Sequence, residues 1–231
     1  MGSDNWPQLA TRTVCVVPVY NECGVLKSVL EELRELFPNV LCVDDGSTDG
    51  SHEIADSLGV RTIRHVVNIG QGGALQTGFA VVMAERRFDY LVTIDADGQH
   101  DPRDAVRMVR LMDEQRLDVV LASRFLGGSA RTVPIHKRII LKFVVLLTRL
   151  TSRSELTDTH NGLRAIRCEV LESTQIRQFG MAHATELVSM LIQSDFRISE
   201  IPVEIRYTRY SRKKGQSILN SVNILLDLLW R

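Results

Sequence analysis

The stretch "VLCVDDGSTDGSHEIADSL", residues 40–58, carries the pattern from which the fold can be predicted. Its first four residues are apolar, which predicts a strand buried on both faces. Two adjacent carboxylates, Asp44 and Asp45, stand where that strand would end, just before a glycine-rich turn. A helical pattern then occupies 51–58. Strand, acidic turn and helix in this order predict one βα unit of a parallel sheet.

The same alternation of apolar and amphipathic runs extends from residue 13 to residue 123. The runs predict strands at 13–19, 40–43, 60–66, 90–97 and 118–123 and helices at 22–37, 51–58, 72–87 and 102–115. Short apolar strands that alternate with helices are typical of a mostly parallel sheet with helices on both faces. We therefore expect an α/β fold.

The pattern after residue 123 is less regular. Helices are expected at 135–153, near 183–194 and after 215–217, and extended segments at 160–167 and 197–207. No repeat, low-complexity tract or linker is visible, so we expect a single domain over 1–231, with halves of about 1–122 and about 123–231. The first and last of these helices could lie on a membrane surface, pair with a membrane-protein partner or pack on the core.

The charges are balanced overall but unevenly distributed. The chain has 28 Lys and Arg and 28 Asp and Glu, so a general nucleic-acid binder is not expected. Residues 1–120 hold 11 basic and 19 acidic residues, whereas residues 121–231 hold 17 and 9. An acidic half followed by a basic half suggests a site with cations on one side and anions on the other, with chance clustering as the alternative.

The cysteines and the apolar runs indicate the compartment. The four cysteines show no CxxC spacing, and Cys15 and Cys42 lie inside apolar runs, as small core residues do in a reducing compartment. No apolar stretch approaches 18 residues, and the N-terminus lacks the apolar core of a signal peptide. We therefore expect a cytoplasmic protein that does not span a membrane.

Acidic residues gather where the predicted strands end. Glu22 follows the first strand, Asp44 and Asp45 end the second, and Asp95 and Asp97 end the fourth. In parallel sheets ligands bind beyond the carboxyl ends of the strands, so these acids should share one rim. Asp95 and Asp97 alternate on an extended backbone, so their side chains should point to opposite sides.

Acids grouped in this way favour a bound cation. A hard divalent cation takes one or two carboxylates and completes its shell with waters and substrate phosphates. Asp97, helped by Asp95 or Gln99, could supply such a site. Several carboxylates on one rim without a cation would repel one another.

Two further patterns have competing interpretations. "DGSTDGSHEIAD" (45–56) has part of the spacing of a calcium loop, but a strand precedes it where such loops have a helix. "NIGQGGAL" (68–75) places glycines at a helix N-terminus, which suits close approach to an anion but equally suits a plain tight turn. It does not fit the dinucleotide fingerprint, because it does not follow the first strand.

Five motifs, taken together and in order, resemble one family. They are "VPVYNE" (17–22), "DDGSTD" (44–49), "GQGGA" (70–74), "DADGQHDP" (95–102) and "SRF" (123–125). The set resembles the inverting family 2 glycosyltransferases of GT-A fold, and within them the dolichyl- and undecaprenyl-phosphate sugar transferases. "DTHNGLRAIR" (158–167) and "HATELV" (183–188) extend the resemblance. It implies a Rossmann-like, mostly parallel central sheet and a less regular, acceptor-side C-terminal region.

The resemblance also implies roles for individual residues. The nucleotide sugar, a UDP- or GDP-linked donor, would be held by Pro18, Tyr20, Glu22, Asp44, Asp45, Gly72, Asp95, Ala96 and Ser123. The metal, Mg²⁺ or Mn²⁺, would be bound by Asp97 and Gln99 together with the diphosphate. The catalytic group would comprise Asp97, Arg124, Arg131, Asp158 and Glu186. Metal and arginine would stabilise the negative charge of the leaving diphosphate.

Two acceptors fit the resemblance. A polyprenyl phosphate is already ionised near neutral pH and needs no general base. A glycan hydroxyl in cell-surface polysaccharide assembly would need one, and Asp158 or Glu186 would then be the candidates. A lipid acceptor predicts a peripheral position at the cytoplasmic face of a membrane.

Two other functions compete with these. A sugar-nucleotide pyrophosphorylase would need a glycine-rich loop straight after the first strand, where this chain has "PVYNECG" (18–24). A non-catalytic nucleotide-sugar-binding protein would not need Asp97 and Arg124.

Overall fold

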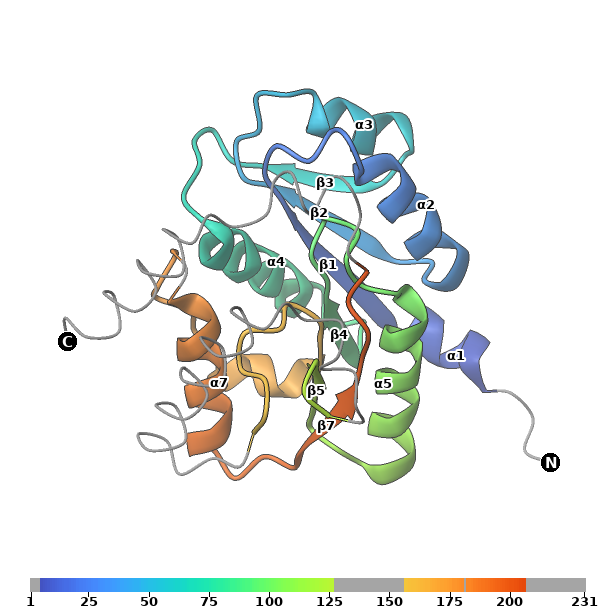
Figure 1. Ribbon diagram of the computed structural model, residues 1–231, viewed down its shortest axis with the longest axis vertical. Helices are drawn as coiled ribbons and strands as arrows, with labels where there is room; N and C mark the ends of the chain where they lie inside the picture. Colours follow the sequence, from blue (N-terminus) through green and yellow to red (C-terminus); the bar gives the residue numbers. More distant parts are fainter. Residues whose placement is uncertain (1–4, 127–155, 181, 207–231) are drawn as a thin grey trace.

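The computed structural model describes residues 5–126, 156–180 and 182–206, and in this part of the chain seven strands form one sheet (Figure 1). The strands are β1 (Thr13–Val19), β2 (Val40–Asp44), β3 (Arg61–Arg64), β4 (Tyr90–Thr93), β5 (Val119–Ser123), β6 (Arg164–Arg167) and β7 (Ile198–Pro202). Their order across the sheet is β3-β2-β1-β4-β6-β5-β7. Within this sheet, β6 runs antiparallel to β4 and β5, and the other neighbours are parallel. The expected mostly parallel sheet is confirmed.

Helices cover both faces of the sheet (Figure 1). They are α1 (Trp6–Thr11), α2 (Leu26–Leu36), α3 (Ser51–Ser57), α4 (Gln71–Glu85), α5 (Pro102–Gln115) and α7 (His183–Gln193), with a 3₁₀ helix, η2 (Cys168–Ser173). Helices α1, α2, α3 and α5 pack on one face, and α4, η2 and α7 pack on the other. The expected α/β arrangement is therefore confirmed.

The central strand β1 shows why its sequence is apolar throughout. Cys15 and Val17 face the core on the α2 and α5 side, whereas Val14 and Val16 face the core on the α4 and α7 side. Successive side chains of a strand point to opposite faces, so a strand between two helical layers has no polar side. All seven residues of β1 are buried accordingly.

The predicted boundaries hold in some places and fail in others. β1 and α5 occupy the residues predicted for them, 13–19 and 102–115. β4 stops at Thr93, although a strand to residue 97 was predicted, because the chain turns at 96–97. α1 and η2 were not predicted, since elements of six residues are too short to show a helical period.

Three predictions lie wholly outside the described residues. They concern the helix at 135–153, the helix after 215–217 and the catalytic role of Arg131. In the described part of the chain, no helix is long and apolar enough to cross a bilayer.

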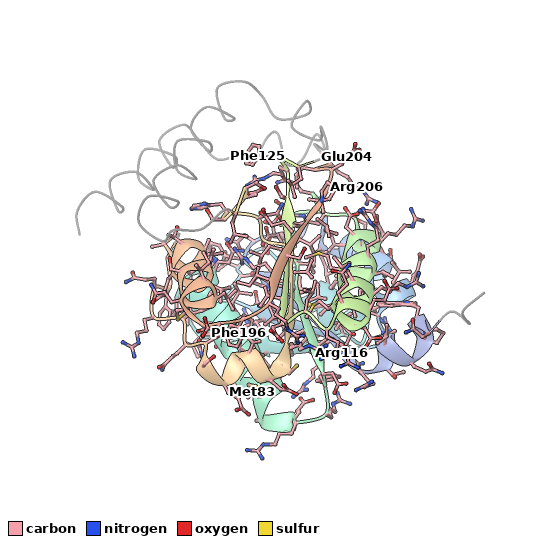
Figure 2. All side chains as sticks on the ribbon, turned by 90° about the horizontal axis from the view of Figure 1, so that it is seen from below. Met83, Arg116, Phe125, Phe196, Glu204 and Arg206 are labelled. Atoms are coloured by element: carbon pink, nitrogen blue, oxygen red, sulfur yellow. The ribbon has the colours of Figure 1, made fainter. Side chains whose placement is uncertain are left out.

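Segments that are far apart in sequence come together at the carboxyl edge of the sheet. Figure 2 shows Phe125, Glu204 and Arg206 together at one end of the sheet, with Arg116 and Phe196 toward the other end. The first three follow β5 and β7, which run parallel to each other. The amino end of the antiparallel strand β6 reaches this same edge. Segments from both halves of the chain therefore meet there.

Gly78 lets α4 approach the sheet closely, and we expect Gly78→Ala to destabilise the protein by about 1 kcal/mol. A Cβ at this position would lie 2.5 Å from Val16 Cγ1, so the helix must move away from β1. This cost outweighs the gain of about 1 kcal/mol that alanine brings to a helix interior. Urea unfolding measures the change. Ala80→Gly, at an exposed site on the same helix, measures the propensity effect alone. A Gly78→Ala protein more stable than the wild type would contradict the close packing.

Candidate active site

A cavity of about 300 Å³ opens at the carboxyl edge of the sheet, where β1, β2 and β4 end. It is lined by Pro18, Val19, Tyr20, Glu22, Asp45, Asn68, Gln71, Ala74, Asp95, Ala96 and Asp97. Seven of the lining residues were predicted to contact the nucleotide sugar or the metal. Asp45 and Asp97 in particular, which come from different strand ends, face one cavity.

Asp45 is fixed by the loop between β3 and α4. Its Oδ2 accepts a hydrogen bond from the Gly70 amide at 2.8 Å, and its Oδ1 accepts one from the Ile69 amide at 3.0 Å. Nδ1 of His65 lies 2.7 Å from the same Oδ1. These contacts satisfy a carboxylate that is only 2% exposed. Asp45 therefore holds the loop in place as well as facing the cavity.

Asp44 lies beside Asp45 in sequence but does not line the cavity. Its Oδ1 accepts a hydrogen bond from the Ser47 amide at 3.1 Å, and its Oδ2 lies 3.3 Å from Nε of Arg64. Both contacts stabilise the turn after β2. The predicted contact of Asp44 with the nucleotide sugar stays a prediction.

Asp95 is held from three sides. Nε2 of Gln71, the first residue of α4, donates to its Oδ1 at 2.7 Å, and Nε2 of His100 lies 3.5 Å from its Oδ2. The third side is the backbone of Gly162, which packs so closely that an added Cβ would lie 2.1 Å from Asp95 Oδ2. Burial by itself raises the pKa of Asp95, but His100 and the buried Arg164 outweigh it and lower that pKa.

The expectation that Asp95 and Asp97 point to opposite sides is wrong. Both residues line the cavity. The expectation assumed an extended backbone as far as residue 97, but the strand ends at Thr93 and a turn begins at Ala96. Once the strand ends, the alternation of side chains ends with it.

Asp97 carries the clearest electrostatic signal in the cavity. Burial, followed by the negative charges of Asp95 and Glu22, raises the pKa of Asp97 to about 6. The Gln99 amide donates to Asp97 Oδ1 at 3.0 Å, and the Gln99 side chain contacts Asp97 Oδ2. Strongly shifted pKa values of this kind are typical of functional sites.

The residues around Asp97 fit a divalent cation shared with a ligand. A carboxylate whose negative charge is disfavoured by its neighbours gains from a cation, and oxygen ligands suit Mg²⁺ and Mn²⁺. Among the described residues, no three His, Cys, Asp or Glu side chains form a group that could hold a metal by itself. Phosphate or water oxygens would therefore have to complete the shell around Asp97, with Gln99 able to offer its amide oxygen after a flip.

Arg124 and Asp158 form a bidentate ion pair at the same edge of the sheet. Arg124 Nε lies 2.6 Å from Asp158 Oδ2, and Nη2 lies 2.7 Å from Oδ1. Burial raises the pKa of Asp158, but Arg124 outweighs it and lowers that pKa. Glu200 on β7 accepts hydrogen bonds from the Thr157 and Asp158 amides. The pair is thus anchored to the sheet.

Ser123 ends β5 beside this pair but is completely buried. Its Oγ lies 2.6 Å from Oγ1 of Thr157 and accepts a hydrogen bond from the Phe125 amide at 3.1 Å. Ser123 therefore shapes the turn that presents Arg124. Its predicted contact with the nucleotide sugar stays a prediction.

Gly72 and Glu186 both serve the segment before α7. The Gly72 amide donates to the Phe179 carbonyl at 3.0 Å, and a Cβ on Gly72 would lie 2.3 Å from the Gln178 carbonyl oxygen. Oε2 of Glu186 accepts hydrogen bonds from the amides of Arg177 and Gln178 at 3.0 and 2.7 Å. The close packing of Gly72 against the backbone of 178–179 thus explains why a glycine stands there. The two amide hydrogen bonds explain the acidic side chain of Glu186. Their predicted roles toward nucleotide sugar and catalysis stay predictions.

Several residues that build the site were not predicted as site residues. Arg164 is 2% exposed, and its charge acts on both Asp95 and Asp158, so it connects the two halves of the site. Gly162 supports Asp95, and Arg206 donates its backbone amide to the Gln99 carbonyl at 2.8 Å. Gly162 and Arg164 lie within "DTHNGLRAIR" (158–167), a stretch that extended the family resemblance but was given no role in the donor or metal site beyond Asp158. That stretch is the sequence signal that could have been followed.

Comparisons with known proteins show the family of this chain. Residues 14–174 match the family described as glycosyl transferase family 2. The chain is 28% identical, over 93% of its length and 93% of the relative, to a UDP-N-acetylglucosamine–dolichyl-phosphate N-acetylglucosaminyltransferase of Methanococcus voltae. It is 31% identical, over 89% of its length and 86% of the relative, to an undecaprenyl-phosphate mannosyltransferase of Micrococcus luteus.

A solved structure shows the same fold. Glucosyl-3-phosphoglycerate synthase from Mycobacterium tuberculosis, in complex with Mn²⁺, UDP and glucosyl-3-phosphoglycerate, superposes with a TM-score of 0.72. The match covers 97% of this chain and 81% of that chain at 20% sequence identity. The sheet and its helices therefore have the expected GT-A arrangement.

Proposed function

This chain belongs to glycosyl transferase family 2 and is a nucleotide-sugar glycosyltransferase, and from that premise we propose that it transfers a sugar from a nucleoside-diphosphate donor to a polyprenyl phosphate. Two relatives named for sugar transfer to dolichyl or undecaprenyl phosphate support this acceptor. A structural neighbour solved with Mn²⁺ and UDP supports a metal-bound diphosphate donor.

The cavity at the carboxyl edge is the proposed donor site. Tyr20 and Asp45 lie on the β1 and β2 side, where the nucleoside would bind, and Asp95 and Asp97 lie at the end of β4. A divalent cation held at Asp97 would neutralise charge on the diphosphate as it leaves. Asp95, fixed by Gln71 and Gly162, would accept hydrogen bonds from donor hydroxyl groups.

In the proposed reaction an acceptor phosphate oxygen attacks the anomeric carbon, and the bond from that carbon to the diphosphate oxygen breaks. The electron pair passes to the leaving nucleoside diphosphate. Arg124 presents a guanidinium held rigidly by Asp158, which suits recognition of a phosphate. Fixed positive charge of this kind stabilises an anionic acceptor and leaving group without reorganisation.

The engagement of both candidate bases, Asp158 and Glu186, in other contacts is the observation that carries the proposed acceptor. A hydroxyl acceptor would need a base, and Asp158 and Glu186 were the candidates. Asp158 has a lowered pKa and is paired to Arg124, which makes it a weak base. Glu186 accepts hydrogen bonds from two backbone amides. A phosphate acceptor needs no proton removed, and the site favours it over a glycan hydroxyl.

The acceptor is part of a lipid, so the proposal also places the enzyme at a membrane surface. The nucleotide-sugar donor and the reduced cysteines fit the cytoplasmic face. The chain would work there as a peripheral protein.

We expect UDP or GDP to raise the melting temperature by about 5 °C at saturating ligand, and only when Mn²⁺ or Mg²⁺ is present. A ligand that binds only the folded state stabilises it, and the diphosphate needs the cation to approach Asp97 and Asp95. A thermal-shift series with each nucleotide, with metal and with EDTA, measures the effect. AMP, which has no diphosphate, is the control. An equal shift in EDTA would count against the metal site.

Acceptor choice has a separate test. Labelled UDP- or GDP-sugar is incubated with undecaprenyl phosphate or dolichyl phosphate, and the product is extracted into butanol. We expect label in the organic phase and equimolar nucleoside diphosphate in the aqueous phase. Label that enters only a water-soluble oligosaccharide would favour the glycan acceptor instead.

A further inference from the structure

Exposed apolar side chains cluster beside the proposed donor site. In the part of the chain that the structure describes, the exposed large apolar side chains are Tyr20, Val66, Val67, Ile69 and Phe179. Val66 is 99% exposed and Val67 is 63% exposed. Tyr20 lines the cavity itself. We call the other four, Val66, Val67, Ile69 and Phe179, the apolar rim.

Ile69 and Phe179 of the apolar rim lie close together although they are far apart in sequence. A Cβ built on Gly73 would lie 2.6 Å from Cδ1 of Ile69 and 3.5 Å from Cγ of Phe179. The Phe179 carbonyl accepts a hydrogen bond from the Gly72 amide at 3.0 Å. Figure 1 shows the start of α4 beside the segment that precedes α7. The two segments thus present one surface.

The backbone beneath the apolar rim is firmly held. Asp45 accepts the amides of Ile69 and Gly70. Gly46 lies so close to the loop that an added Cβ would be 2.8 Å from the carbonyl carbon of Val67. Because the backbone of this loop is held in place, the exposure of Val66 and Val67 belongs to the folded structure. Contiguous exposed apolar surface usually marks a place of interaction.

The segments that form the apolar rim carry basic side chains and no acidic ones. Residues 64–73 and 174–180 contain no acidic residue. Arg64 and Arg177 are exposed within them, and Arg64 is paired with Asp44 of the neighbouring turn. Apolar side chains flanked by arginines suit a surface that offers hydrocarbon below anionic headgroups.

We propose that the apolar rim rests on a lipid bilayer that bears anionic headgroups, with Val66 and Val67 inserted at the headgroup boundary. The proposal rests on the proposed function, because a lipid-borne acceptor must bring its phosphate to the adjacent cavity. An enzyme seated by the apolar rim would bring Tyr20 and Asn68, two exposed residues that line the cavity, close to the membrane plane. The rim would then keep the cavity near its acceptor.

Vesicle binding by the full-length chain tests this surface. Sucrose-loaded vesicles of phosphatidylcholine with phosphatidylglycerol are sedimented with wild type, with the double variant Val66→Ser/Val67→Ser and with Ala84→Ser. Ala84 is exposed at the far end of α4, away from the apolar rim. We expect the double variant to lose about tenfold in vesicle affinity, because two valine side chains are no longer transferred from water into the bilayer interface. Wild type and Ala84→Ser should bind equally, and less to neutral vesicles.

Three outcomes would overturn the proposal. One is wild-type protein that binds no vesicles, and another is a double variant that binds as tightly as wild type. The third is a wild-type dimer, measured by light scattering, that the double substitution turns into a monomer without any vesicle binding. That outcome would assign the apolar rim to a second copy of the chain.

Release of nucleoside diphosphate from the sugar donor separates this proposal from the proposed function. Measured without vesicles, it should be the same in the double variant and the wild type, because Val66 and Val67 do not line the cavity. If vesicle binding depends on the apolar rim but no sugar is transferred to a lipid phosphate, the proposed acceptor is wrong and the proposed membrane-binding surface is still supported. Transfer to a detergent-dissolved lipid phosphate without vesicle binding would refute the surface alone.

Discussion

Asp97→Asn is expected to reduce metal-dependent sugar transfer by about a thousandfold while making the metal-free protein more stable. The loss follows because an amide cannot replace the charge that holds a divalent cation against a diphosphate. Hydrogen bonds from Gln99 need not be lost, since the Gln99 amide can flip to face the new side chain. Initial rates with Mn²⁺, compared with wild type, measure the loss.

The gain in stability follows from the pKa of Asp97. Burial and the neighbouring carboxylates raise this pKa from 3.8 to about 6, so the folded state binds the proton more tightly than the unfolded state does. Above about pH 6 the charged carboxylate therefore destabilises the fold, by about 3 kcal/mol, and asparagine removes this cost. As the pH falls through 6 toward 4, wild type regains its stability and the advantage of Asn should vanish.

Urea unfolding in EDTA at pH 7.5 and at pH 4 measures this second effect. Asp56→Asn, at an exposed aspartate on α3, controls for the general loss of one negative charge. A variant that loses both activity and stability at pH 7.5 would show that Asp97 serves the fold, contrary to its placement in the metal site.

Gly162→Ala is expected to lower the transfer rate by about a hundredfold or more with a much smaller loss of stability. The added Cβ would lie 2.1 Å from Oδ2 and 2.4 Å from Cγ of Asp95, so the carboxylate must leave its position. The Asp95 side chain is 29% exposed, so we expect it to rotate toward the cavity and the backbone of the fold to be spared. It would then lose its hydrogen bond from Gln71 and its alignment with the donor.

Gly180→Ala provides the matched control, because nothing lies within 4 Å of a Cβ at that position. A double-mutant comparison of stability tests the contact between the added Cβ at position 162 and the Asp95 carboxylate. In an Asp95→Ala background, Gly162→Ala should cost no further stability, since the clashing carboxylate is gone. A Gly162→Ala enzyme with wild-type rates would show that the position of Asp95 is unimportant for transfer.

The helical and sheet layers could be predicted correctly because they depend on local periodicity. Apolar runs such as 13–19 and amphipathic runs such as 102–115 are visible within a single window, and both elements occur where they were predicted. The placement of acids at strand ends likewise followed from the parallel sheet. Asp45 and Asp97 could be expected on one rim before any coordinates were known.

The partners of those acids could not be predicted. The antiparallel strand β6 enters between β4 and β5, and this order brings Gly162 and Arg164 to Asp95. No local pattern encodes a contact between residues almost seventy positions apart. The turn after Thr93, which directs both Asp95 and Asp97 into one cavity, was also missed.

By itself the sequence determined an α/β sheet, its helical layers and the edge at which a ligand would bind, because hydrophobic period and strand-end position are local properties of the chain. Only the tertiary structure decided which acids face the cavity and which ones, such as Asp44 and Glu186, are occupied by backbone amides. The reason is physical: the charge and direction of a carboxylate depend on burial and on neighbours from distant segments, and both arise only when the chain is folded.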